Sequence, residues 1–303
     1  IVLLRSALQA HPKDGAAREL LGQAYLRAGD AAGALKELRR AVALGRDSVD
    51  NALALAKAHL LRGEFDEASG RLAAVRDDAS PAWCLLSAEV LAARGEFDDA
   101  VPMYEQALTL APASLEAYLG LARAHMGLGD LDAAEAALAR AAGQDISGLE
   151  LWLLQGQLGL ARRRFEEARV AFERVLQLAP DHEFALLGAA SAALGNERYD
   201  TATALMDRLP EAAQAGPRAL FLRAMVAAGQ REAQAALGFL RRVLAAAPAH
   251  VESMRQAARL HFQLGEYPLA EHMLRRLLKQ MPSDAPALRM LEAVQLASGQ
   301  FDG

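Results

Sequence analysis

The stretch at 94–100, RGEFDDA, nearly repeats the stretch at 62–68, RGEFDEA, and these two copies decide the fold. The central position of the motif recurs along the chain at intervals of 34 residues, with a single interval of 32. It falls at Ala31, Phe65, Phe97, Leu131, Phe165, Tyr199, Ala233, Tyr267 and Phe301. Self-similarity at one fixed period predicts a stacked repeat architecture.

Each period contains two amphipathic helical patterns. Over 114–143, apolar residues recur at helical spacing, and Gly127 and Gly129 interrupt the pattern between two helices. Ser80 and Ser114 are predicted helix N-caps, the former followed by Pro81 at the first helical position. Second helices are predicted to end before prolines, namely Pro112, Pro180 and Pro248.

The composition supports helices and excludes some functions. Hydrophobic residues make up 53% of the 303 residues, but aromatic residues only 5%, so Ala and Leu dominate and favour helix over strand. The net charge of −5 argues against nucleic acid as a partner, because a binder of nucleic acid should carry a basic surplus. No apolar run is long enough to cross a membrane, so no membrane insertion is expected within 1–303.

The repeats resemble tetratricopeptide repeats, whose period is also 34 residues. One unit carries the typical residues Leu21, Gly22, Tyr25, Ala34, Leu38 and Ala41, and a later unit carries Trp152, Gly156, Ala168, Phe172 and Pro180. The resemblance covers essentially the whole chain. It implies an all-α fold, an α-solenoid or superhelix of antiparallel helix pairs, with about eight full units and a half repeat at each end.

We expect one array over 1–303. A partial repeat occupies 1–14, full units start near 15, 49, 81, 115, 149, 183, 217 and 251, and a partial repeat occupies 285–303. Neither end carries a polar capping helix, which a solenoid needs to cover its apolar face. We therefore expect the native protein to continue in both directions, and end-to-end self-association is a further expectation.

No group of residues indicates catalysis, a metal site or a cofactor. The acids of RGEFDDA, such as Asp98 and Asp99, fall at a helix start, where they complement the helix dipole rather than converge on a metal. His59, His125 and His261 share the repeat slot of Tyr25, so they should pack between helices. Cys84, the one cysteine, occupies a core slot, so we expect no disulfide and no enzymatic nucleophile.

The candidate ligand site lies on the first helix of each unit. In the resembling family, ligands usually lie in a concave groove lined by particular positions of the first helices. Transferred to this chain, the candidates are Leu85, Leu119, Arg123, Leu153, Gln157, Leu187, Phe221, Met225, Arg255 and Arg259. Gly120 and Gly188 are expected to add space, and Arg255 and Arg259 to accept an acidic end of the ligand. Alternatively, the leucines pack against neighbouring helices and leave the groove without a role.

The sequence therefore favours a non-enzymatic scaffold that binds a protein or peptide segment. Two alternatives are the repeat arm of a larger enzyme and a regulator whose helical array changes curvature when a peptide binds. Residues 4–45 are also similar to bacterial tetratricopeptide lipoproteins associated with PEP-CTERM and exosortase systems. That similarity implies a role in the bacterial periplasm or envelope, linked to exopolysaccharide, against a cytoplasmic alternative.

Overall fold

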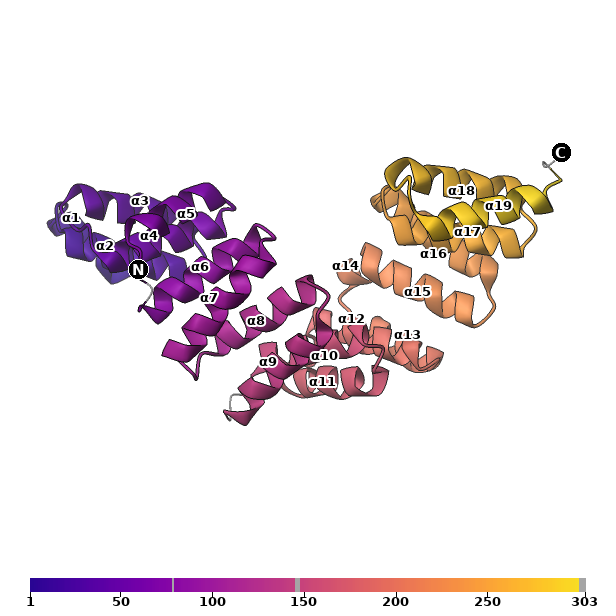
Figure 1. The fold of residues 1–303 in the computed structure, drawn as a ribbon, viewed down its shortest axis with the longest axis horizontal. Coiled ribbons are helices and arrows are strands. Elements are labelled where there is room, and N and C mark those ends of the chain that lie inside the picture. The colour runs from indigo at the N-terminus through magenta and orange to yellow at the C-terminus, as the bar shows by residue number, and fades with distance from the viewer. Residues whose placement is uncertain (78, 145–147, 300–303) are drawn as a thin grey trace. The chain divides into compact units, whose positions relative to one another are not determined.

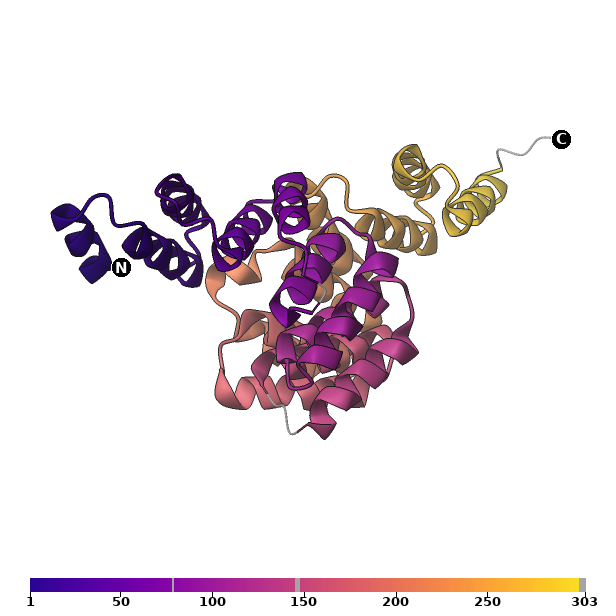
Figure 2. The same cartoon turned by 60° about the vertical axis from the view of Figure 1, so that its left-hand side comes forward.

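The computed structural model describes residues 1–77, 79–144 and 148–299, and within them helices are the only regular elements. The chain forms two compact units, Ile1–Leu151 and Trp152–Gly303. The first unit contains α1 (Val2–Ala10), α2 (Gly15–Arg27), α3 (Ala31–Ala43), α4 (Val49–Leu61), α5 (Phe65–Ala74), α6 (Pro81–Ala93), α7 (Phe97–Leu110), α8 (Leu115–Gly127) and α9 (Leu131–Gly143). Figures 1 and 2 show consecutive helices lying side by side in this unit.

The second unit is built in the same way. It contains most of α10 (Leu149–Ala161), then α11 (Phe165–Leu178), α12 (Glu183–Gly195), α13 (Tyr199–Asp207), α14 (Glu211–Gln214), α15 (Pro217–Gly229), α16 (Ala233–Ala246), α17 (Val251–Gln263), α18 (Tyr267–Gln280) and α19 (Ala285–Ala297). The all-α fold of paired helices is thus confirmed. A single array over 1–303 stays a prediction, and the last copy of the motif, at Phe301, lies outside the described residues.

The motif RGEFDDA forms the turn between paired helices. α6 ends at Ala93, Gly95 takes a φ of 80°, and the Glu96 N–H donates to the Leu91 carbonyl at 3.0 Å. This positive φ and back-donation close the helix in the way typical of a glycine C-terminus. α7 then begins at Phe97, with Asp98 and Asp99 in its first turn. The motif therefore marks a turn, as predicted.

Helix boundaries follow the predicted signals. Ser80 accepts a hydrogen bond from the Trp83 N–H, and Ser114 accepts one from the Ala117 N–H, so both N-caps are confirmed. α7, α11 and α16 end two residues before their prolines, at Leu110, Leu178 and Ala246. Local sequence chemistry thus sets the length of these helices.

The unit that starts with α12 departs from the expectation of two regular helices. Its second helix, α13, ends at Asp207, and the separate short helix α14 follows. Pro210 has no N–H to continue the helix, and the Gln214 side chain donates instead to the carbonyls of Asp207 and Leu209 at 3.2 and 2.9 Å. The expectation of an unbroken pair was wrong here, although Pro210 was a readable signal.

Candidate binding site on the first helices

The ten candidate residues differ in how much of each side chain reaches the surface. Leu119 and Leu187 are buried, with exposed fractions of 1% and 4%. Arg123 and Arg259 are exposed. The others are half-buried, and they are Leu85, Leu153, Gln157, Phe221, Met225 and Arg255. Each unit therefore presents a mixed surface on its first helices, with two of the predicted leucines packed beneath it.

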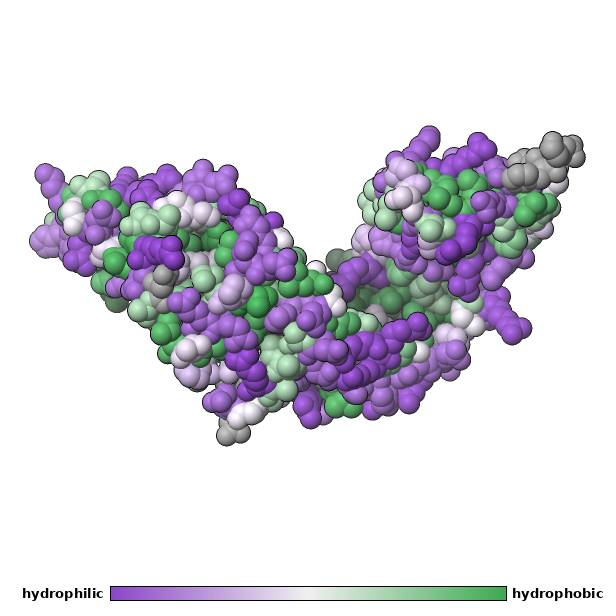
Figure 3. Space-filling view, viewed as in Figure 1, coloured by the Kyte–Doolittle hydropathy of each residue, from purple (hydrophilic) through white to green (hydrophobic). Residues whose placement is uncertain are grey.

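Exposed hydrophobic side chains alone do not single out a site. On the face drawn in Figure 3, hydrophilic residues cover much of the surface of each unit, with hydrophobic residues exposed between them. Scattered apolar exposure of this kind is normal for a folded protein. Hollows on the first helices are therefore the more informative feature.

The first unit has a pocket of about 420 Å³ formed by α6, α7, α8 and the start of α10. We call it the α8 pocket. Its lining residues are Glu89, Ala92, Ala93, Phe97, Tyr104, Glu116, Leu119, Gly120, Arg123, Ala124 and Glu150. Two of them, Leu119 and Arg123, belong to the predicted set. The acids and Tyr104 were not predicted, because their proximity depends on how successive repeats stack.

Tyr104 gives the α8 pocket a buried hydroxyl group. The residue is 3% exposed, and it lines the pocket from α7. Burial, reinforced by the negative charge of Glu89, raises the pKa of Tyr104 well above its ordinary value. The hydroxyl therefore stays protonated and remains able both to donate and to accept a hydrogen bond.

The second unit has a more apolar hollow of about 470 Å³ between α12, α14 and α15. Phe184, Leu187, Ala213 and Pro217 contribute to its lining, and the Arg218 guanidinium lies 5.0 Å from the centre of the Phe184 ring. Of the predicted residues, Leu187 alone lines this hollow. The hollow exists because Pro210 breaks the second helix and brings α14 beside α12, a consequence that the sequence analysis missed.

Histidines serve structural roles in both units. His182 and His250 cap α12 and α17, because the Nδ1 atom of each accepts a backbone N–H at 3.2 and 3.1 Å. His59 is 2% exposed, and its Nδ1 lies 2.6 Å from the Glu64 carboxylate. His261 makes the same contact with Glu266. Packing between helices is thus confirmed for His59, while His125 and His261 are half-buried, and capping by histidine was not foreseen.

Of the two arginines predicted to accept an acidic end of the ligand, only Arg259 is free to do so. Arg255 donates to Asp284 at 2.6 Å and also pairs with Glu252, so its guanidinium is already bound within the protein. Donation from the Ala287 N–H, together with Arg255, holds the pKa of Asp284 below its ordinary value against the opposing effect of burial. The Arg259 side chain, by contrast, is exposed and makes no ion pair or hydrogen bond to any described residue.

Gly120 and Gly188 do not add space to a groove. A Cβ atom at Gly120 would lie 2.3 Å from the Tyr104 ring, and one at Gly188 would lie 2.4 Å from the Phe172 ring. Each glycine lets an aromatic ring of the preceding repeat approach the helix backbone. The expectation of added space was therefore wrong, since the neighbouring ring fills it.

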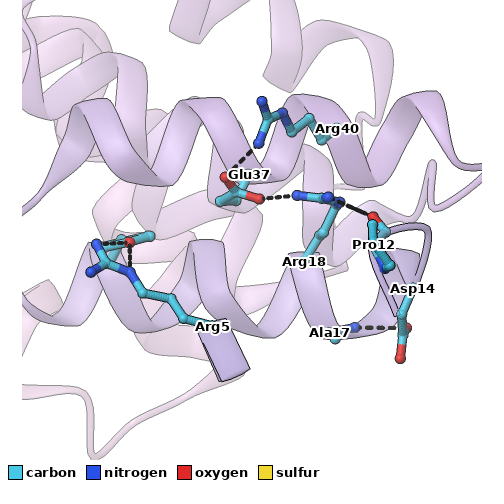
Figure 4. Close-up of polar contacts among 8 residues, drawn as sticks. Arg5, Pro12, Asp14, Ala17, Arg18, Glu37 and Arg40 are labelled. Atoms are coloured by element: carbon cyan, nitrogen blue, oxygen red, sulfur yellow. Dashed lines mark hydrogen bonds and ion pairs between the residues drawn. The ribbon is translucent and has the colours of Figure 1, made fainter. Parts of the chain in front are cut away.

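Buried charges near the N-terminus are paired within the protein. Glu37 is 7% exposed and lies between Arg18 and Arg40, which donate to its two carboxylate oxygens (Figure 4). Arg18 also donates to the Pro12 carbonyl at 3.0 Å. Such partners offset the desolvation of a buried carboxylate, and because they occupy both of its oxygens we assign no ligand to this cluster.

The described residues also bear on metal binding and on membrane crossing. No group of three or more His, Cys, Asp or Glu side chains in this part of the chain is placed to hold a metal ion. None of the described helices is long and apolar enough to cross a bilayer.

Comparison with known sequences supports the repeat assignment. The sequence profile described as tetratricopeptide repeat matches residues 1–48, 25–83, 91–158, 159–226 and 227–294. No curated protein matches the sequence.

Solved structures with a similar fold have low sequence identity. A chain from the APC/C hetero-tetramer Cut9-Hcn1 aligns with a TM-score of 0.69 at 14% identity, over 92% of this chain and 58% of that one. This chain thus spans less than two thirds of that relative. PilW, a widely conserved type IV pilus biogenesis factor, aligns with a TM-score of 0.61 at 17% identity, over 69% of this chain and 96% of its own.

A tetratricopeptide repeat protein from Parabacteroides merdae ATCC 43184 aligns with a TM-score of 0.57 at 15% identity, over 80% of this chain and 96% of that one. At these identities the similarity establishes the fold alone.

Proposed function

Because this chain belongs to the tetratricopeptide repeat family, we propose that it is a non-enzymatic scaffold that binds a segment of another protein on its first helices. The family fold is consistent with protein–protein interaction. The proposed contacts are the half-buried members of the predicted set other than the paired Arg255, with Leu119 and Leu187 buried beneath them.

One observation carries this proposal. Each unit has a hollow on its first helices, and both hollows are lined by the fifth residue of a first helix, Leu119 in α8 and Leu187 in α12. Equivalent repeat positions thus line recesses of similar volume, about 420 and 470 Å³. Recesses with apolar floors and polar rims are suited to the side chains of an extended or helical peptide.

The test is selection of peptides from a random display library on the full chain. We expect peptides that bind reversibly and saturably, and we expect Leu153→Asp to weaken their binding by about tenfold, because a charge replaces a half-buried apolar anchor. Circular dichroism should show unchanged helicity. Failure to select any binder refutes the scaffold proposal, whereas loss of helicity in the variant shows that Leu153 belongs to the core.

The envelope role is a finer proposal, favoured by the similarity of residues 4–45 to PEP-CTERM-associated lipoproteins. It requires the complete gene to encode a lipid-attachment signal before this segment. Sequencing that gene with its neighbours tests the idea. An export signal with a lipid-attachment cysteine supports an envelope scaffold in exopolysaccharide production, and a start without one removes it.

A further inference from the structure

We propose that the α8 pocket receives a cationic side chain of the bound segment, with arginine as the best fit. This inference rests on the proposed function and adds the chemistry of the partner. It reverses the expectation of an acidic ligand end near Arg255, which is already paired.

The pocket has more negative than positive charge. Three carboxylates line it, from Glu89, Glu116 and Glu150, against the single guanidinium of Arg123. Glu89 pairs with Lys57 of α4. The Glu116 carboxylate is exposed and has no ion pair or hydrogen bond to a described residue. A ligand that brought one positive charge would therefore be complementary to this rim.

Among the residues that the structure describes, one ion pair crosses the rim, and it is weak. Arg123 and Glu150 approach only to 3.8 Å, and their side chains are 57% and 67% exposed. Exposed pairs of this kind contribute little, because water and salt screen them and both long side chains lose freedom. Glu150 can therefore exchange Arg123 for a ligand guanidinium without a large loss.

The hydroxyl of Tyr104 is an independent indication of a polar ligand. The residue is nine-tenths buried and reaches the pocket, yet its hydroxyl makes no hydrogen bond to a described residue. Phe172 occupies the same repeat position and packs on Gly188, the equivalent of Gly120, without a hydroxyl. Packing alone thus does not require the oxygen, which is free to accept a hydrogen bond from a ligand N–H.

The rest of the lining fits the shape of an arginine side chain. Ala92 and Ala93 offer apolar surface for its methylene stem, and the buried Leu119 and Ala124 lie at the floor. Phe97 and Tyr104 offer aromatic rings near a planar cation, and two carboxylates can take its forked N–H groups. A bare metal ion does not fit, since no cluster of three or more His, Cys, Asp or Glu side chains in the described residues could hold one.

The experiment compares two probes of nearly equal shape, N-acetyl-arginine amide and N-acetyl-citrulline amide. Binding to the full chain is followed by NMR of the Leu119, Ala92 and Ala124 methyl groups. The proposal expects saturable shifts with the arginine probe, weakened by added salt, and much smaller shifts with the uncharged citrulline probe. Equal shifts from both probes overturn it.

Variants of the pocket should change the affinity for the arginine probe in opposite directions. Glu116→Gln with Glu150→Gln should weaken arginine binding by about tenfold, and Tyr104→Phe by about fivefold, through lost charge-assisted and neutral hydrogen bonds. Arg123→Ala should strengthen it several-fold, because a like charge leaves the rim. Asp50→Asn is the matched control, since Asp50 holds the same first-turn position of α4 as Glu116 of α8 but does not line the pocket.

These outcomes separate the two proposals. Unchanged arginine binding in both the double carboxylate variant and Arg123→Ala overturns the cationic pocket, while peptides selected on the chain still support the scaffold. If selection yields no binder at all, the scaffold fails and the pocket's role fails with it. An effect of Asp50→Asn as large as that of the rim variants points to general charge attraction and also overturns the inference.

Discussion

At the scale of single residues, the turn between paired helices requires a left-handed backbone whatever residue stands there. Glycine occupies the turn in most repeats, for example Gly95 and Gly129, with φ values of 80° and 77°. Arg163, Glu197 and Arg231 hold the same conformation, with φ values of 58°, 57° and 64°. A side chain there crowds its own backbone, which glycine avoids.

Arg231→Gly should therefore stabilise the second unit by about 0.5–1 kcal/mol. The Arg231 side chain is exposed and makes no ion pair or hydrogen bond to a described residue, so little is lost when it is removed. Urea denaturation measures the change. Gln230→Gly is the control, because Gln230 has an ordinary φ of −77° and should gain nothing. Equal effects of the two substitutions contradict the argument.

Asp284 provides a pH-dependent prediction. Its carboxylate accepts the Ala287 N–H and the Arg255 guanidinium, and its pKa is lowered in the folded state. Unfolded Asp binds a proton near pH 3.9, so this stabilisation is complete above that pH and is lost as the pH falls through the lower folded pKa. Asp284→Asn keeps an oxygen to cap the helix but removes the charge.

The wild type should therefore be more stable than Asp284→Asn at neutral pH, with a difference that shrinks below about pH 3.9 and disappears in stronger acid. Denaturation with urea at a series of pH values measures both proteins. A difference that stays constant down to the lowest pH would show that Asp284 acts through packing and not through its charge.

At the scale of helices, a ring in one repeat is matched to the residue it meets in the next. The rings of Tyr104 and Phe172 meet Gly120 and Gly188, the sixth residues of α8 and α12. In the first unit, Leu38 holds the ring's position, and the corresponding sixth residue of α4 is Ala54, which packs against the same cluster. A larger side chain in one helix is thus accommodated by a smaller one in its neighbour.

Gly188→Ala should destabilise the second unit by about 1–2 kcal/mol, although Ala favours helix, because its Cβ would overlap the Phe172 ring. With Phe172→Leu, which copies the Leu38 and Ala54 pairing, the double variant should lose less than the sum of the single changes. Gly238→Ala in α16 is the control, since nothing lies within 4 Å of the added Cβ, and it should stabilise by about 1 kcal/mol. Additive losses would disprove the coupling.

Helix boundaries could be predicted from the sequence because their causes are local. Ser80, Ser114 and the prolines act within a few residues of themselves. The helix break at Pro210 also has a local cause, but the regular 34-residue period around it led to the expectation of one continuous helix. Burial of Leu119 was one of two alternatives that the sequence left open, and pairing of Arg255 was not predicted. Each depends on side chains of a neighbouring repeat, such as Asp284, 29 positions from Arg255.

At the scale of the whole molecule, the extensive contacts that the structure records between helices all join helices of the same repeat or of adjacent ones. α2, for example, contacts α1, α3 and α4, and α18 contacts α17 and α19. Stability in such a chain is nearly a sum of local terms, so it does not have to unfold in one step. Loss of a core side chain should then lower stability mainly in its own repeat and the adjacent ones.

Leu38→Ala and Leu274→Ala test this locality, because each removes a leucine with no exposed surface, one in each unit. Either change should cost about 2–5 kcal/mol of local stability. Hydrogen exchange followed by mass spectrometry should show faster exchange in α1–α4 for Leu38→Ala, with α15–α19 unchanged, and the reverse pattern for Leu274→Ala. Uniformly faster exchange over all described helices in either variant would show that the chain unfolds as one cooperative body and that its repeats are not energetically local.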